Sequence, residues 1–85
     1  MNKKIDTDFS PSIKTLIRIL LCVQEQGPSA KTNLSRKTNL NYTRLAKHIV
    51  WLEKKGLVES VIDKSKIKIE LTVKGREFAE TISTD

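Results

Sequence analysis

The sequence predicts a small α+β domain that is mostly α-helical. Apolar residues recur every three or four positions in residues 10–26, 30–37 and 42–55, which is the spacing of amphipathic helices. Apolar and polar residues then alternate through residues 57–71, which is typical of an antiparallel hairpin. A last helical pattern covers residues 73–83. The expected order is therefore three helices, a hairpin and a C-terminal helix.

The length of 85 residues indicates one domain with one core. Hydrophobic residues make up 38% of the chain, which is enough for a globular fold. Residues 1–9 are polar and charged apart from Met1, Ile5 and Phe9. We therefore expect an N-terminal arm over residues 1–9, followed by a single domain over residues 10–85.

The composition excludes several classes of protein. The longest apolar run spans residues 19–23, far short of the ~20 residues that a membrane span needs, and the polar N-terminus does not resemble a secretion signal. We therefore expect a cytoplasmic protein without membrane contact. One Cys and one His cannot form an intrachain disulfide or a Cys/His zinc site. The three glycines are isolated and form no phosphate-binding loop. We expect no cofactor, no metal and no enzymatic activity.

The first helix is expected to have Ser10 as its N-cap and Pro11 in its first turn, and to stop at Gly27-Pro28. Its predicted core stripe consists of apolar residues at helical spacing: Ile13, Leu16, Ile17, Leu20 and Val23. Further apolar residues lie outside that stripe, namely Ile19, Leu21 and Cys22. The helix is therefore either central and covered on two sides or in contact with a second subunit. The small size of the domain favours the second interpretation.

The second and third helices are separated by a short break in the pattern. Ser29 is the expected N-cap of the second helix, residues 30–37. The segment 38–40 (Thr-Asn-Leu) ends it, since Asn tolerates the left-handed conformation found at helix ends. Asn41 is the expected N-cap of the third helix.

The third helix, residues 42–55, has two chemically different faces. Its apolar stripe is expected to contain Tyr42, Leu45, Ile49 and Leu52. Its opposite face carries polar and basic side chains: Thr43, Lys47 and Lys54, flanked by Arg44. Gly56 is expected to end the helix.

The remaining residues predict a hairpin and a closing helix. A strand at residues 57–62 and a polar turn at residues 63–66 precede a half-buried strand that contains Ile67, Ile69 and Leu71. Thr72 is expected to cap the last helix, whose inner face would hold Phe78, Ala79 and Ile82.

This order of elements predicts a winged helix-turn-helix. A short helix, a tight turn and an amphipathic helix form a helix-turn-helix, and the hairpin that follows is the wing. The second helix of such a pair needs one face that packs on the core and one basic face narrow enough to enter a DNA major groove. Residues 42–55 offer both.

The distribution of charge agrees with that interpretation. The chain has 16 Lys and Arg against 10 Asp and Glu, a net charge of +6. Residues 26–52 contain no acidic residue, and the predicted wing adds three lysines, Lys64, Lys66 and Lys68. The other eight basic residues are matched by ten acidic ones. The excess is therefore local to the elements that would meet DNA phosphates.

Two motifs resemble a known family. The segment Thr38-Asn39-Leu40-Asn41-Tyr42 and the later Lys55-Gly56-Leu57-Val58 resemble small archaeal winged helix-turn-helix proteins of the MarR-like group of transcription regulators. Residues 71–78 are similar to the "LTxKGxxF" stretch that follows the wing in that family, and the resemblance covers residues 10–83. It implies a DNA-binding fold and usually a homodimer.

The sequence departs from some relatives at its C-terminal end. Those relatives extend the last helix into a dimerising coiled coil, whereas about three turns follow Thr72 here, too few for several heptads. We therefore expect any dimer interface to use apolar residues of the first helix, together with the arm and the last helix: Ile5, Phe9, Ile19, Leu21, Cys22, Phe78 and Ile82.

The predicted DNA contacts lie mainly at the start of the third helix. Thr43 and Arg44 are candidates for base contacts, and Lys47 for a phosphate contact. Asn41 is a better candidate for a helix cap than for a base contact. Tyr42 is a candidate phosphate contact through its hydroxyl group, and packing of its ring alone is the alternative. Further candidates for backbone contacts border the turn and the wing: Lys31, Ser35, Arg36, Lys37, Lys64, Lys66 and Lys68.

Three other side chains have a structural and a functional interpretation. His48 lies beside the apolar stripe of the third helix, which favours a hydrogen-bonded, partly buried side chain. The alternatives are a DNA contact and a pH-sensitive group. Trp51 is expected to pack against the wing or a partner. Cys22 is best explained as a small apolar residue in a helix interface. A redox-sensing role would need neighbours that stabilise the thiolate, and Arg18, four residues earlier, is the one candidate.

The leading hypothesis is a dimeric, sequence-specific regulator that binds double-stranded DNA. Its third helix would enter the major groove and the wing, residues 57–71, would contact the flanking backbone. The alternatives are a winged-helix subunit of a protein assembly and a non-specific binder of chromatin or RNA.

Overall fold

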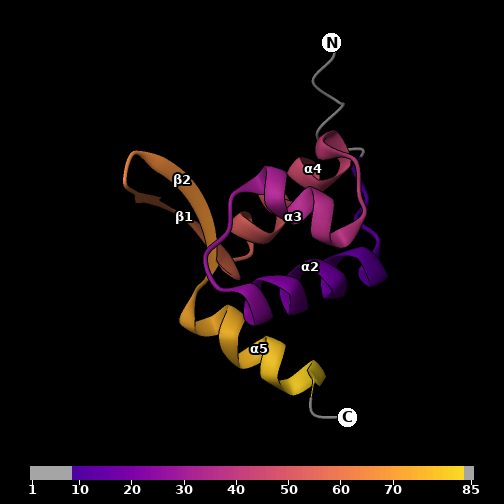
Figure 1. Cartoon of the computed structure of the whole chain (residues 1–85). Coiled ribbons are helices and arrows are strands. Elements are labelled where there is room, and N and C mark those ends of the chain that lie inside the picture. The colour runs from indigo at the N-terminus through magenta and orange to yellow at the C-terminus, as the bar shows by residue number, and fades with distance from the viewer. Residues whose placement is uncertain (1–8, 84–85) are drawn as a thin grey trace.

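Four helices and one hairpin make up the part of the chain that the structure describes, residues 9–83, in this computed structural model (Figure 1). In chain order the elements are α2 (Ile13–Gln26), α3 (Lys31–Thr38), α4 (Tyr42–Lys54), β1 (Val58–Asp63), β2 (Lys66–Leu71) and α5 (Val73–Ser83). The predicted α+β class, the order of elements and their approximate bounds are confirmed. None of the helices within these residues combines the length and the apolar character needed to cross a membrane.

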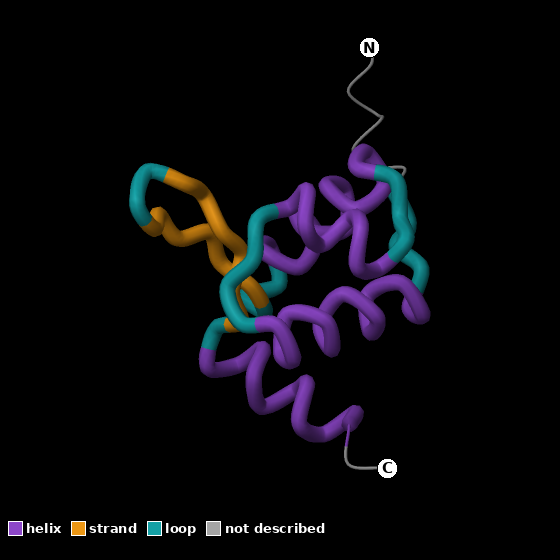
Figure 2. The backbone as a smooth tube through the Cα atoms, in the orientation of Figure 1, coloured by secondary structure: helices purple, strands orange, loops and turns teal. Residues whose placement is uncertain are grey.

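Helix α2 occupies the centre of the molecule (Figures 1 and 2). Helices α3 and α4 lie on its upper side in this view, and α5 runs along its lower side in roughly the opposite direction. The hairpin projects at the left and rises to the same side as α3 and α4. Helix α2 contacts all of the other three helices and β2. The wing and the helix-turn-helix therefore share one side of the domain, and α5 lies on the other.

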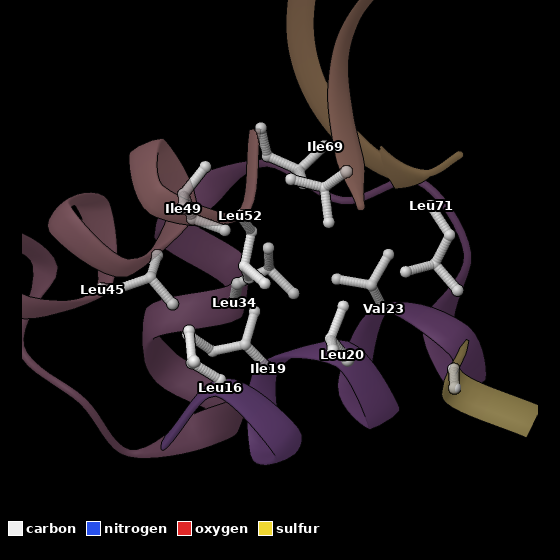
Figure 3. Close-up of a cluster of buried hydrophobic side chains, with 12 residues drawn as sticks. Leu16, Ile19, Leu20, Val23, Leu34, Leu45, Ile49, Leu52, Ile69 and Leu71 are labelled. Carbon is white, nitrogen blue, oxygen red and sulfur yellow. The ribbon is translucent and has the colours of Figure 1, made fainter. Parts of the chain in front are cut away.

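The hydrophobic core lies between α2, α3, α4 and the hairpin (Figure 3). Its buried apolar side chains are Leu16, Ile19, Leu20, Val23, Leu34, Leu45, Ile49, Leu52, Val58, Ile69, Leu71 and Ala79. Every helix and both strands contribute to it. A core drawn from all the elements makes their relative positions interdependent.

The predicted core stripe of α2 is wrong at three positions. Ile17 is half-buried and lies outside the core. Ile19 is fully buried, although it was expected outside the stripe and at a dimer interface, and Ile13 is exposed. The physical reason is that Ile19 lies three residues after Leu16 and four before Val23, so it completes an equally regular stripe. Helices α3 and α4 pack against that second stripe and leave Ile13 outside. Ile19 is therefore unavailable to a partner.

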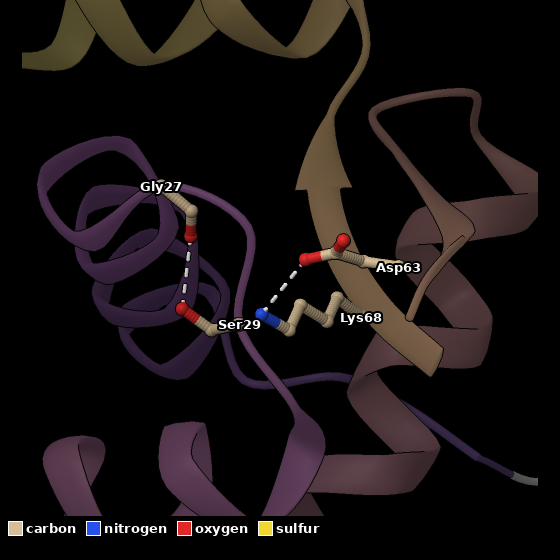
Figure 4. Close-up of polar contacts among 4 residues, drawn as sticks. All are labelled: Gly27, Ser29, Asp63 and Lys68. Carbon is tan, nitrogen blue, oxygen red and sulfur yellow. Dashed lines mark hydrogen bonds and ion pairs between the residues drawn. The ribbon is translucent and has the colours of Figure 1, made fainter. Parts of the chain in front are cut away.

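Two predicted helix caps are also corrected. Ser12, not Ser10, caps α2, because its Oγ accepts a hydrogen bond from the backbone N–H of Thr15 (3.2 Å). The N-cap of α3 is Ala30, which has no side-chain cap. Ser29 instead exchanges two backbone hydrogen bonds with Ile69, and its Oγ donates to the carbonyl of Gly27 (2.8 Å; Figure 4). Ser29 thus joins the start of the helix-turn-helix to the wing.

The turn between α3 and α4 has the predicted chemistry. Asn39 adopts the left-handed conformation, with φ 61°, and its backbone N–H donates to the last turn of α3. Oδ1 of Asn41 accepts the backbone N–H of Arg44 at 2.8 Å. Both predictions are confirmed. Tyr42 is half-exposed, however, so the apolar stripe of α4 begins at Leu45 and not at Tyr42.

The wing is a regular antiparallel hairpin. Val58 pairs with Leu71, and the pairing continues to Asp63 with Lys66. Lys64 and Ser65 both have positive φ (51° and 66°), as in the two-residue turns that match the twist of the strands. The predicted burial is confirmed for Ile69 and Leu71 and is wrong for Ile67, which lies next to the turn and is exposed.

Helix α5 begins where the chain passes very close to the end of the helix-turn-helix. Oγ1 of Thr72 accepts the backbone N–H of Gly75 at 2.9 Å, which confirms the predicted cap. A Cβ atom on Gly75 would lie 1.8 Å from the carbonyl oxygen of Leu57. A glycine is therefore required at this position. On the inner face of α5, Ala79 is buried, whereas Phe78 is exposed and Ile82 is half-buried.

Replacing Gly75 by alanine should destabilise the fold. The added methyl group overlaps a backbone atom that a side-chain rotation cannot move, so we expect a loss of about 2–3 kcal/mol in the free energy of unfolding. Urea denaturation followed by circular dichroism measures it. Glu77→Ala, on the exposed side of the same helix, is the matched control and should change stability by less than about 0.5 kcal/mol. An unchanged midpoint for Gly75→Ala would contradict the close approach.

Candidate nucleic-acid interface

Helix α4 has a fully buried face and a basic, exposed face. Leu45, His48, Ile49 and Leu52 point into the core. On the other side Thr43, Arg44, Lys47 and Lys54 are exposed. The spacing of Thr43, Lys47 and Lys54 places them in one row along the helix. This row begins in the first turn, where recognition helices contact base edges.

His48 ties α4 to the segment in front of α2. Its Nδ1 donates to the carbonyl of Arg44 (2.8 Å), and its Nε2 accepts the backbone N–H of Ser12 (3.2 Å). The donor at Ser12 assigns the proton to Nδ1. The ring is 2% exposed, and Phe9 meets it edge-on with ring centroids 5.0 Å apart. The prediction of a hydrogen-bonded histidine is confirmed, and burial removes His48 from the candidate DNA contacts.

These contacts fix the backbone of Arg44 on both sides. Its N–H donates to Asn41 and its carbonyl accepts from His48. A guanidinium can form two hydrogen bonds with the O6 and N7 atoms of guanine, provided that its backbone holds it at the correct position. Arg44 is therefore the best-positioned candidate for base recognition in the described residues.

Side-chain hydrogen bonds also hold the turn and α3. Ser35 Oγ donates to the carbonyl of Leu40, and Thr38 Oγ1 donates to the carbonyl of Leu34 at 2.6 Å. Arg18 of α2 donates to the carbonyl of Thr38 at 3.1 Å. Ser35 and Asn41 are thus engaged in holding the helix-turn-helix together, which gives a structural role to two of the predicted DNA contacts.

The remaining cations of α3 border the same surface. Lys37 and Arg36 are exposed, and Lys31 is half-buried. Arg36 donates to Oδ1 of Asn33 at 2.8 Å, a contact within one turn of the helix. These side chains lie on the helix that precedes the turn, where contacts with the DNA backbone are expected.

The three wing lysines are not equivalent. Lys64 and Lys66 are exposed at the tip. Lys68 forms an ion pair with Asp63, with Nζ 3.1 Å from Oδ2 (Figure 4). Its charge is therefore partly neutralised within the hairpin, which weakens Lys68 as a phosphate contact relative to the other two.

Val50 belongs to the exposed face of α4 and was missed by the sequence analysis. It is 46% exposed and lies between Lys47 and Lys54 in the same row. An apolar side chain at such a position can contact the methyl group of thymine. Its spacing of seven residues from Thr43 was the signal that could have identified it. Trp51, on the neighbouring side, packs against the core, and Nζ of Lys55 lies 5.2 Å from its ring centroid.

The structure separates the residues proposed for a dimer interface. Ile19 is excluded by burial, and Ile5 lies outside the described residues. Phe9 contacts His48 and Cys22 packs partly against the core. Leu21 and Ile82 are half-buried, and Phe78 is 44% exposed. The surviving candidates thus gather on α2 and α5, which lie side by side (Figure 1).

Cys22 has the properties of a packing residue. Burial raises the pKa of its thiol, the carboxylate of Glu25 raises it further, and Lys37 lowers it by a smaller amount. Arg18, the expected thiolate-stabilising neighbour, hydrogen-bonds to Thr38 instead. A redox-sensing thiol needs a lowered pKa, so these surroundings favour the structural interpretation.

A helix-turn-helix with an adjoining hairpin and a basic exposed second helix defines a winged helix-turn-helix protein. The chain belongs to this family, because the model of the winged helix-turn-helix family matches residues 12–84. No curated protein sequence matches the chain. The match to the family model and the observed order of elements confirm the predicted winged helix-turn-helix fold.

Solved structures that share this fold include those of MarR family proteins. A MarR family protein from Bacillus stearothermophilus is 25% identical and superposes with a TM-score of 0.76 over 94% of this chain and 56% of that chain. A MarR family transcriptional regulator from Silicibacter pomeroyi is 25% identical, with a TM-score of 0.73 over 80% and 49%. BpsR from Bordetella bronchiseptica, whose DNA binding is regulated by 6-hydroxynicotinic acid, is 18% identical, with a TM-score of 0.78 over 93% and 59%.

The MarR-like resemblance is thus confirmed at the level of the fold. The chain spans about half to three fifths of the length of these proteins. The archaeal source implied by the resemblance is not tested by these likenesses and stays a prediction.

The thiol of Cys22 should be slow to react. Because its pKa is raised, less thiolate is present near neutral pH than for an exposed cysteine, so alkylation by iodoacetamide should be several-fold slower and should accelerate as the pH rises. A variant that combines Cys22→Ser with Ser10→Cys supplies an exposed thiol as the control. Equal alkylation rates for the folded wild-type protein and the folded variant would contradict the assigned environment.

Proposed function

We propose that this protein is a sequence-specific transcription regulator that binds double-stranded DNA as a dimer. Helix α4 enters the major groove, and the wing contacts the flanking DNA. The observation that carries this proposal is the row Thr43, Lys47, Val50 and Lys54, which is exposed on a helix whose other face is buried in the core. The protein belongs to the winged helix-turn-helix family and is similar in structure to MarR family proteins, which supports the same proposal.

The shape and charge of the interface suit a duplex. Helix α4 presents base-reading and phosphate-binding side chains together, while Lys37 and Arg36 of α3 and Lys64 of the wing are exposed beside it. Phosphate contacts from such flanking cations position a protein, and contacts in the groove specify sequence. The net charge of +6 adds a long-range attraction to DNA.

A dimer is supported by apolar side chains that α2 and α5 leave exposed. Phe78 and Val73 of α5 and Ile13 of α2 are exposed, and Leu21 and Ile82 are half-buried. Scattered apolar residues are ordinary on protein surfaces, but these lie on two helices that pack side by side (Figure 1). A second copy on this face would leave both α4 helices free to enter successive major grooves.

The protein should bind duplex DNA with a strong dependence on salt. Each phosphate neutralised by a lysine or arginine releases counterions, so affinity should fall steeply between low and physiological salt. Fluorescence anisotropy with random duplexes and with duplexes from the protein's own promoter region measures it. A preference for the promoter duplex supports a specific regulator. Equal affinity for both duplexes would favour the non-specific binder, and no binding at low salt would favour a subunit of a protein assembly.

Replacing Arg44 and Lys47 by alanine should affect DNA binding in different ways. Arg44→Ala should cost about 1–3 kcal/mol of binding free energy and relax the preference at one base pair, because it removes a base contact. Lys47→Ala should weaken all duplexes alike and reduce the salt slope by about 1, as expected for a phosphate contact. Both side chains are exposed, so neither substitution should disturb the fold. Each variant therefore serves as a folded control for the other. An equal loss of affinity for all duplexes with Arg44→Ala would show that Arg44 contacts the DNA backbone and not a base.

Phe78→Lys should separate the dimer. A lysine at the centre of an apolar interface should raise the dimer dissociation constant about thirtyfold or more, which sedimentation equilibrium detects. The side chain is 44% exposed in the single chain, so the fold should survive. Ile62→Thr, at an exposed position on the wing, is the control and should leave the dimer intact. A wild-type protein that stays monomeric at high concentration would refute this interface.

A further inference from the structure

The wing has two faces of opposite character. Directly paired residues of a hairpin project to the same side. One face therefore holds Val58, Ser60, Ile62, Ile67, Ile69 and Leu71, and the other holds Glu59, Val61, Asp63, Lys66, Lys68 and Glu70. We call them the apolar face and the ionic face.

The apolar face continues beyond the core. Val58, Ile69 and Leu71 are buried against the helices. Further out, Ile62 pairs with Ile67 directly before the turn, and these side chains are 78% and 60% exposed. Two large β-branched side chains are thus held side by side at the tip, with no covering element in the described residues. Core packing does not require them there.

The ionic face is poorly suited to DNA. Glu59 lies directly opposite Glu70, and Asp63 lies opposite Lys66 and forms its ion pair with Lys68. A phosphate backbone that approached this face would meet three carboxylates against the two ammonium groups of Lys66 and Lys68, which is a net negative charge. Electrostatics therefore favours a duplex that meets the turn and the apolar face.

We propose that the Ile62–Ile67 pair enters the minor groove next to the major groove occupied by α4, and selects A·T base pairs there. This inference rests on the proposed DNA-binding function. The wing rises on the same side of the domain as α3 and α4 (Figure 1). Lys64, exposed in the turn that follows Ile62 and Asp63, can reach a phosphate that borders the groove.

The preference for A·T follows from hydrogen-bond chemistry. In the minor groove guanine carries an N2 amino donor, which A·T pairs lack. An isoleucine side chain offers no acceptor, so covering that amino group leaves it without a partner and costs free energy. Apolar wedges in the minor groove also favour base steps that unstack easily. The pair should therefore disfavour G·C at the position it covers.

A base analogue tests the contact without changing the protein. The probe is a duplex selected from a random library by the wild-type protein, with its flanking A·T pairs replaced in turn by G·C and by inosine·C. Inosine keeps the major-groove atoms of guanine and lacks the N2 amino group. At the position under the wing, G·C should weaken binding about tenfold, and inosine·C should restore it. Equal affinity for G·C and inosine·C at every flanking position would overturn the proposal.

Variants of the wing complete the test. The double variant Ile62→Thr, Ile67→Thr keeps β-branched residues in the strands and should bind the G·C and inosine·C duplexes within about twofold of each other. Val61→Thr, in the same strand but on the ionic face, is the matched control and should discriminate like the wild type. If the double variant still discriminates, or changes the sedimentation mass of the free protein, the proposal is overturned. Failure of the wild type to select any duplex would instead refute the proposed function.

Discussion

The packing of α2 is the constraint on which the other elements depend. Its buried stripe, from Leu16 through Ile19 to Val23, faces α3, α4 and the hairpin, while α5 lies along another side. A close-packed core transmits displacement rather than absorbing it. In the proposed dimer, α2 and α5 would form the contact between subunits. The separation of the two α4 helices would then be set by the packing of α2, and not by a flexible linker.

Hydrogen bonds add precision that apolar packing does not give. A leucine stripe tolerates small rotations of α4, whereas His48 must keep its contacts with Arg44 and with Ser12. Losing either partner would leave a buried polar group unsatisfied, which costs about 1–3 kcal/mol. The same backbone carbonyl that His48 binds belongs to the residue proposed to read a base. The buried side of the recognition helix therefore positions its exposed side.

The sequence predicted most of the features whose cause lies within four residues, with the Ser12 cap of α2 as the exception. The Asn41 cap, the left-handed Asn39 and the Thr72 cap are of this kind. Features that depend on a distant element were missed: α3 and α4 select Ile19 over Ile13, and β2 takes Ser29 from its expected cap. The candidate site follows the same division. Periodicity predicted the basic face of α4, but not that the core ends before Ile62 and Ile67.

The arrangement of charge and apolar groups bears on how such a protein distinguishes DNA sequences. Contacts from Lys37, Lys47 and Lys64 would act on any duplex and weaken as salt rises. Contacts from Val50 and the Ile62–Ile67 pair involve no ions, so salt would leave them nearly unchanged. As ionic strength increases, non-specific binding would therefore fall while the apolar contribution to recognition persists. On this argument the exposed isoleucines of the wing are a source of specificity, and the surplus of positive charge is chiefly a source of affinity.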